Sequence, residues 1–112
     1  MTEGRPVVAT VEYRADVELL FSSTAQDGRP SMFEFMDIDH REICRRFSDE
    51  WERLPPLMDE LPDRFREEYD LSGTGHLFVW TVLGRQATDG TIELVSLTIE
   101  WLDGRDVLPN DL

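Results

Sequence analysis

The stretch DIDHREICRRFSDEWERLPP, residues 37–56, decides the fold, because it contains the clearest helical pattern in the chain. Its large apolar residues recur at spacings of four, four and three, which place side chains on one face of an α-helix. These residues are Ile43, Phe47, Trp51 and Leu54. The pattern predicts a helix over residues 40–54 whose apolar stripe must be buried against another layer.

Residue types at both ends of this helix also predict where it begins and stops. Asp39 stands where an N-cap is expected, and Glu42 follows three residues later, as in a capping box. Pro55 and Pro56 cannot continue the helix, because proline has no backbone N–H to donate. A helix bounded in this way is the reference point for the rest of the chain.

Apolar and polar residues alternate through the N-terminal third of the chain. The stretches VVATVEYR (7–14), DVELLF (16–21) and SMFEFMDI (31–38) place apolar side chains at alternating positions. This is the period of a half-buried β-strand. The pair Asp27-Gly28 is a turn signal between the second and third stretches. We therefore expect three strands before the helix.

The segment that follows the two prolines has two interpretations. A helix over residues 56–70 would carry Pro62 in its middle, where the ring removes a backbone hydrogen bond at a cost of about 3 kcal/mol. A strand over residues 64–71 is favoured, since the turn SGTG (72–75) then joins it to the apolar stretch HLFVWTVLG (76–84). Two strands joined by a hairpin loop are therefore expected here.

The stretch TIELVSLTIEWL (91–102) alternates again and predicts the last strand. The expected fold is α+β: an antiparallel sheet of five or six strands with the helix of residues 40–54 on one face, in the order β-β-β-α-(short turn)-β-β-β. A single domain spans residues 1–112, with loosely ordered ends at about 1–5 and 104–112.

One helix cannot cover every apolar residue expected on such a sheet. The residues left over include Val8, Leu20, Phe78, Trp80 and Val82. We therefore expect either a homodimer through the sheet or a partner protein that docks there.

The composition is that of a folded, strongly acidic protein, with 40% hydrophobic residues and a net charge of −13. Phosphate backbones and anionic lipids repel such a chain, so no direct nucleic-acid or membrane binding is expected. No apolar run is long enough to cross a bilayer, MTEGRPVVAT does not resemble a signal peptide, and Cys44 is the single cysteine. A cytoplasmic location is therefore expected.

The acidity is spread along the chain, although SDEWERLPPLMDELPDRFREEYD (48–70) has nine acids against three arginines. The net charges of residues 1–38, 39–70 and 71–112 are −4, −5 and −4. All eleven basic residues are arginine, as in proteins from GC-rich or salt-adapted genomes. This even distribution argues against a dedicated imitation of nucleic acid.

No residue pattern indicates catalysis, a cofactor or a metal. His40 and Cys44 lie at i, i+4 on the expected helix and could supply two zinc ligands, but a site needs three or four, and His76 is far along the chain. Cys44 lacks the flanking signature of a nucleophile. Glu34 and Glu67 are expected on apolar faces, where a raised pKa suits acid–base chemistry, yet no substrate motif accompanies them. No enzymatic activity is therefore expected.

The first functional hypothesis is a small, non-enzymatic acidic protein that binds a basic protein partner, as inhibitors, immunity proteins and anti-defence proteins do. Electrostatic steering would speed its association with a positively charged target. Tryptophan is enriched in binding hot spots, so Trp80 would add an apolar contact to the acids. The expected contact residues are Asp59, Glu60, Asp63, Glu68 and Trp80.

Two other functions remain open. One is a small-molecule-binding or enzymatic domain with a pocket between helix and sheet. The residues expected to line that pocket are Cys44, Trp51, Phe65, Glu67 and Tyr69. The other is a structural or assembly subunit, which oligomeric state in solution would reveal.

Overall fold

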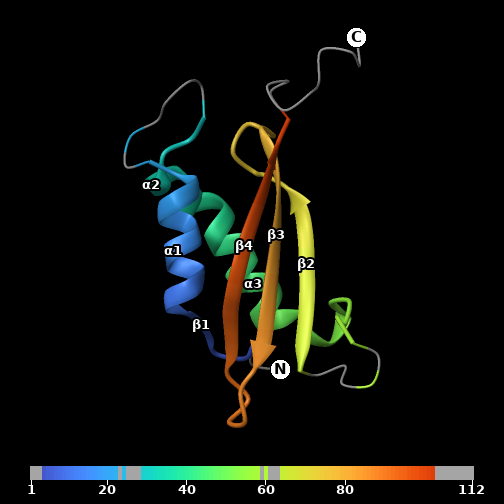
Figure 1. Cartoon of the computed structure of the whole chain (residues 1–112). Helices are drawn as coiled ribbons and strands as arrows, with labels where there is room; N and C mark the ends of the chain where they lie inside the picture. Colours follow the sequence, from blue (N-terminus) through green and yellow to red (C-terminus); the bar gives the residue numbers. More distant parts are fainter. Residues whose placement is uncertain (1–3, 23, 25–28, 59, 61–63, 103–112) are drawn as a thin grey trace.

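The structure is a computed structural model that describes residues 4–22, 24, 29–58, 60 and 64–102. A four-stranded mixed sheet forms one layer and two helices form the other (Figure 1). The elements in chain order are β1 Val7–Ala9, α1 Val11–Leu20, α2 Met32–Glu34, the π-helical turn η1 Phe35–Asp39, α3 His40–Asp49, the 3-10 turn η2 Trp51–Arg53, β2 Phe65–Leu71, β3 Phe78–Gln86 and β4 Ile92–Trp101.

The predicted sheet of five or six antiparallel strands with one helix is wrong. The described residues contain four strands, and β1 is parallel to its neighbour β4. The error lies in the N-terminal third, where only Val7–Ala9 of the three predicted strands is a strand. The C-terminal prediction is confirmed: residues 65–71, 78–86 and 92–101 form an antiparallel meander.

α1 forms a helix because the residues that become buried recur every four positions. Tyr13, Val17 and Phe21 are buried, whereas Val11 and Leu19, which produced the alternating pattern, are 79% and 85% exposed. A short alternating run thus also contained a helical period.

Thr10 fixes the beginning of α1. Its side chain accepts a hydrogen bond from the backbone N–H of Tyr13 (3.2 Å), as an N-cap does. Its hydroxyl donates to the carbonyl of Leu94 on β4 (2.7 Å). One side chain therefore begins the helix and joins it to the sheet.

The second helical segment begins earlier than the sequence predicted. Ser31 is the N-cap of a complete capping box with Glu34, and the chain is then helical through α2, η1 and α3. Phe35 continues the buried stripe towards the N-terminus, at spacing four from Asp39. The predicted strand over 31–38 is therefore wrong, because a polar residue at Asp39 hid the helical period in the sequence.

Asp39 does precede α3, but it has helical backbone angles and its side chain makes no capping hydrogen bond, so it is a buried residue inside the helical segment and not the predicted capping residue. Its carboxylate accepts hydrogen bonds from the Ser72 hydroxyl (2.8 Å), the Gly73 N–H (2.7 Å) and the Thr74 hydroxyl (3.1 Å). These donors belong to the loop between β2 and β3, where Gly75 has a positive φ. The carboxylate thus attaches the hairpin loop to the helix.

The strand order in the sheet is β1-β4-β3-β2. α1 lies beside β4 in Figure 1, and the N–H of Leu97 on β4 donates to the Asp16 carboxylate of α1 (2.9 Å). Val95 is an extra residue in β4, since Leu83 pairs with Ser96 and Gly84 with Leu94. The bulge brings both Leu94 and Leu97 to the helix side of the sheet, where both are buried.

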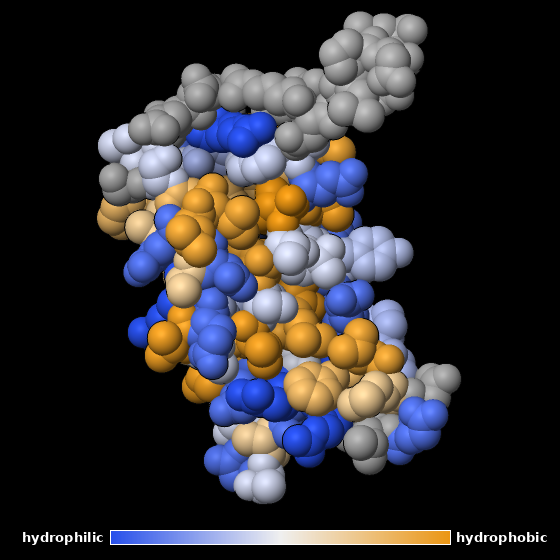
Figure 2. Space-filling model, viewed as in Figure 1, coloured by the Kyte–Doolittle hydropathy of each residue, from blue (hydrophilic) through white to orange (hydrophobic). Residues whose placement is uncertain are grey.

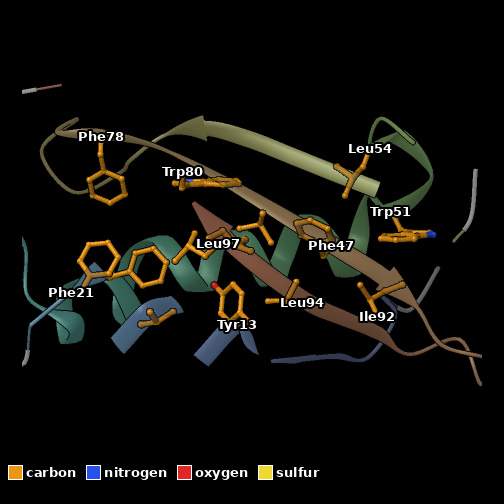
Figure 3. Packing of buried hydrophobic residues seen from close by; sticks show 14 residues of the cluster. Tyr13, Phe21, Phe47, Trp51, Leu54, Phe78, Trp80, Ile92, Leu94 and Leu97 are labelled. Carbon is orange, nitrogen blue, oxygen red and sulfur yellow. The ribbon is translucent and has the colours of Figure 1, made fainter. Parts of the chain in front are cut away.

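The core fills the space between the helices and one face of the sheet, here called the inner face (Figure 3). The predicted stripe of the main helix is confirmed, with Ile43, Phe47, Trp51 and Leu54 all buried. At Gly84 a Cβ atom would lie 2.4 Å from the Phe47 ring, so glycine is required for this close approach. The described helix–sheet interface is therefore closely packed near α3.

Candidate functional site

The outer face of the sheet, opposite the helices, is the first candidate surface. Alternation along β2 and β3 places one set of side chains on the inner face and the next set on the outer face. Tyr69 and Leu71 on β2 are 64% and 41% exposed, and they pair across the strands with Thr81 and Val79. No helix among the described residues covers this face, and Figure 1 looks onto it. The apolar side chains there are accessible to a partner.

Figure 2 shows the same view with apolar side chains over the strands and polar ones between and around them. Three carboxylates follow from the register: Glu67 opposite Leu83, Glu100 opposite Val79, and Glu93 opposite Arg85. Arg85 is bound to Glu93 at 2.8 Å, so its charge is offset locally. The outer face therefore combines apolar contact area with net negative charge.

The β2 edge of this sheet and the part of β4 beside α1 have bound backbone N–H groups. The carbonyl of Pro55 accepts a hydrogen bond from the outward N–H of Glu67 (3.0 Å). The next two outward N–H groups of β2 donate to the carboxylate of the preceding residue: Tyr69 to Glu68, and Leu71 to Asp70. On the other side, α1 closes β4, as described above. Acidic side chains on edge strands prevent edge-to-edge association. The accessible apolar surface of the sheet is thus its outer face.

A second candidate site is a hydrogen-bonded chain of Tyr13, His40 and Cys44 between α1 and α3. The Tyr13 hydroxyl is 2.9 Å from His40 Nδ1, and Cys44 Sγ is 3.4 Å from His40 Nε2. In a neutral imidazole one nitrogen donates and the other accepts, so both are engaged in either tautomer. His40 also separates two hollows of about 260 and 480 Å³.

The environment shifts the pKa of each of the three groups in the direction that favours its uncharged form. Burial raises the pKa of the Tyr13 hydroxyl well above its ordinary value and raises the pKa of the Cys44 thiol. Burial, and secondarily the charge of Arg14, lowers the pKa of His40. A nucleophilic cysteine requires a lowered pKa and a cationic neighbour. The arrangement is thus suited to packing and not to thiolate chemistry.

The described residues do not bring together three side chains of the kind that bind metals. His40 and Cys44 do lie close, as their i, i+4 spacing predicted. Asp39, however, is directed to the β2–β3 loop, and His76 is an exposed residue of that loop with a φ of 55°. The pair therefore has no third ligand in this part of the chain.

The structure does not assemble the predicted helix–sheet pocket from its five residues. Trp51 is buried in the core, and Cys44 lies in the hollow beside His40. Phe65, Glu67 and Tyr69 alternate onto the outer face. These five residues do not line one pocket, because strand alternation and the helix stripe place them on opposite sides of the sheet.

The predicted partner-binding residues also separate. Asp59 and Asp63 lie outside the described residues, and Glu60 is exposed. Glu68 is on the inner face, 3.5 Å from Arg46 of α3. Trp80 is 1% exposed, and the Arg46 guanidinium lies over its ring, 5.3 Å from the centre of the tryptophan ring.

Trp80 belongs to the core because the sheet's inner face is covered by two helices. Phe78 and Val82, which were expected to be left over with it, are buried there too. Leu20 packs against the core, whereas Val8 is 46% exposed.

Sequence reasoning missed Tyr13 as a buried residue and did not identify which residues lie on the outer face. Tyr13 was assigned to a strand, and Thr10 three residues before it was the N-cap signal that could have identified a helix. The outer face was predicted as a feature, but its residues depend on the strand register.

The described residues contain no helix of the length and apolarity that crossing a bilayer requires.

Comparisons of the chain with protein-family models, with curated proteins and with solved structures gave no match, so the function has to be argued from the molecule's own surfaces.

Proposed function

We propose that this protein is a non-enzymatic binding protein that recognises a basic protein partner through the outer face of its sheet. The observation that carries the proposal is the uncovered apolar strip at Tyr69, Leu71 and Val79, set among the carboxylates of Glu67 and Glu100. Exposed apolar patches surrounded by polar residues are typical of protein interaction sites.

Charge complementarity selects the class of partner. The whole chain carries a net charge of −13, and two arginines lie at the outer face: Arg85, which is bound to Glu93, and Arg64, whose guanidinium lies over the Phe65 ring, 5.7 Å from the ring centre. A second copy of this chain would bring the same negative face against it, and like charges oppose that association. A partner with a positively charged surface is attracted at long range and also buries Tyr69, which supplies a rigid aromatic contact.

The chemistry of the other candidate site favours binding over catalysis. Cys44 and His40 form a pair, but burial holds both in the uncharged form. An enzyme that used this pair would need the thiolate, which is the nucleophilic form. A binding function requires no such group.

The test is capture of partners from the native host by the immobilised protein and by two matched variants. Tyr69→Ser with Leu71→Ser alters the outer face. Val11→Ser with Leu19→Ser alters two exposed apolar residues of α1 and is the control. Neither pair lies in the core, so both variants should fold.

We expect the parent chain and the α1 variant to retain the same basic protein, which dissociates at high salt, whereas the outer-face variant loses it. Equal capture by both variants would reject this surface. Self-association of the parent chain in light scattering would favour the assembly-subunit alternative, and a captured acidic protein would contradict the charge argument.

A further inference from the structure

The smaller hollow, of about 260 Å³, lies between α1 and the helical segment of residues 32–49. Its volume is below the roughly 300–1,000 Å³ of sites for drug-sized ligands, so an occupant must be small. The hollow is on the helical layer, away from the outer face of the sheet. It is a separate candidate for binding.

The interior of this hollow is mostly apolar. Val17 of α1, Met32 and Met36 form much of its wall, and methionine side chains adapt readily to an apolar occupant. Tyr13 and His40 also line it, but they are hydrogen-bonded to each other at 2.9 Å. The interior therefore offers contact area and little free hydrogen-bonding capacity.

The mouth of the hollow carries two opposite charges. Arg14 and Glu18 both line it, and they are one helical turn apart on the exposed side of α1. Neither forms an ion pair with any residue in the part of the chain that the structure describes. The other arginines that border His40 differ: Arg41 pairs with Asp37, and Arg45 with Glu42 and Glu50. Arg14 and Glu18 are thus available to a ligand.

An occupant must satisfy an apolar interior, one cation and one anion. A simple carboxylic acid would face Glu18, and a simple amine would face Arg14, so each would be repelled by one of the two groups. A zwitterion avoids both repulsions. We propose that this hollow binds a free apolar α-amino acid of about the size of leucine or methionine, with its carboxylate at Arg14, its ammonium at Glu18 and its side chain against Val17, Met32 and Met36.

The proposal is tested with three ligands that share one side chain. L-leucine carries both charges, N-acetyl-leucine lacks the ammonium, and leucinamide lacks the carboxylate. The last two also represent the C-terminal and N-terminal residues of a peptide. Binding is followed by NMR amide shifts of the full chain, read at Val17, Met36 and His40, with ligand in the millimolar range.

We expect leucine to bind and each single-charge analogue to bind at least about threefold more weakly, as exposed charge pairs permit. Arg14→Met should weaken the binding of leucine, so that its affinity falls close to that of leucinamide. Glu18→Gln should weaken the binding of leucine, so that its affinity falls close to that of N-acetyl-leucine. Glu12→Gln, an exposed acid in the same helix that does not line the hollow, is the matched control and should change nothing.

Three results would overturn the proposal. They are the absence of leucine-induced shifts at these amides, equal binding of leucine and both analogues, and equal effects of Glu18→Gln and Glu12→Gln. Leucinamide or N-acetyl-leucine binding more tightly than leucine would instead assign the hollow to a peptide terminus. The readout is independent of the outer face, so failure here leaves the proposed partner binding intact.

Discussion

Asp39 joins the helical layer to the sheet through several hydrogen bonds at once. Its buried carboxylate accepts three hydrogen bonds from the loop between β2 and β3. Sequence position suggested a helix cap, because a surface Asp before an apolar stripe is commonly one. Its true partners are more than thirty residues away in sequence, so no local pattern could reveal them.

Replacing Asp39 by Ala should therefore destabilise the fold by roughly 2–4 kcal/mol, since the buried Ser72 hydroxyl and two partly buried donors lose their acceptor. Urea unfolding measures the effect. Asp37→Ala is the control, because Asp37 is exposed and 3.7 Å from Arg41, and it should cost no more than about 0.5 kcal/mol. Equal costs for the two variants would mean that Asp39 does not hold the loop.

His40 should make stability depend on pH. Burial lowers its pKa in the folded state, so below the unfolded-state pKa of about 6.5 the unfolded chain binds more protons. The stability that the uncharged His40 contributes is complete above the unfolded-state pKa. It is lost as the pH falls from that value towards the lower pKa of the folded state. NMR titration of the His40 ring should give a pKa below the ordinary value, and His40→Gln should reduce the fall in unfolding free energy between neutral and mildly acidic pH. A ring that titrates at or above the ordinary value would contradict this.

At the scale of elements, the C-terminal strands were predictable and the N-terminal helices were not. β3 is a nearly continuous apolar run, β4 alternates, and both lie between turn signals, which favours strands. The sequence of α1 fits both the two-residue period of a strand and the period of a helix. Contact with β4 decides which of its side chains become buried. Tertiary contacts settle such short ambiguous segments, which is why the sequence alone predicted them wrongly.

The helical segment of residues 32–49 gives a direct test of its unexpected beginning. Ser31→Ala removes the side chain that accepts the N–H of Glu34 and should cost about 1 kcal/mol. Ser31→Thr keeps the hydroxyl and the capping box, so it should cost less. Thermal unfolding monitored by circular dichroism compares the two. If both variants unfold like the parent chain, the segment does not begin at Ser31.

At the scale of the whole molecule, the two faces of the sheet have different roles. The inner face is filled by the helices, with Trp51 and Trp80 fully enclosed. The outer face keeps Tyr69 and Leu71 accessible among carboxylates, while carboxylates accept backbone N–H groups along the β2 edge and at Leu97 of β4. Composition predicted the acidity, but only the register identifies which side chains lie on the outer face.

Hydroxyl-radical footprinting of the protein with and without its captured partner tests the proposed interface most directly. Tyr69 on the outer face and Phe33 on α2 are both reactive aromatic residues and are 64% and 78% exposed. We predict that the partner protects Tyr69 from oxidation and leaves Phe33 unchanged. Protection of Phe33 with continued oxidation of Tyr69 would contradict the proposal and place the interface on the helical layer.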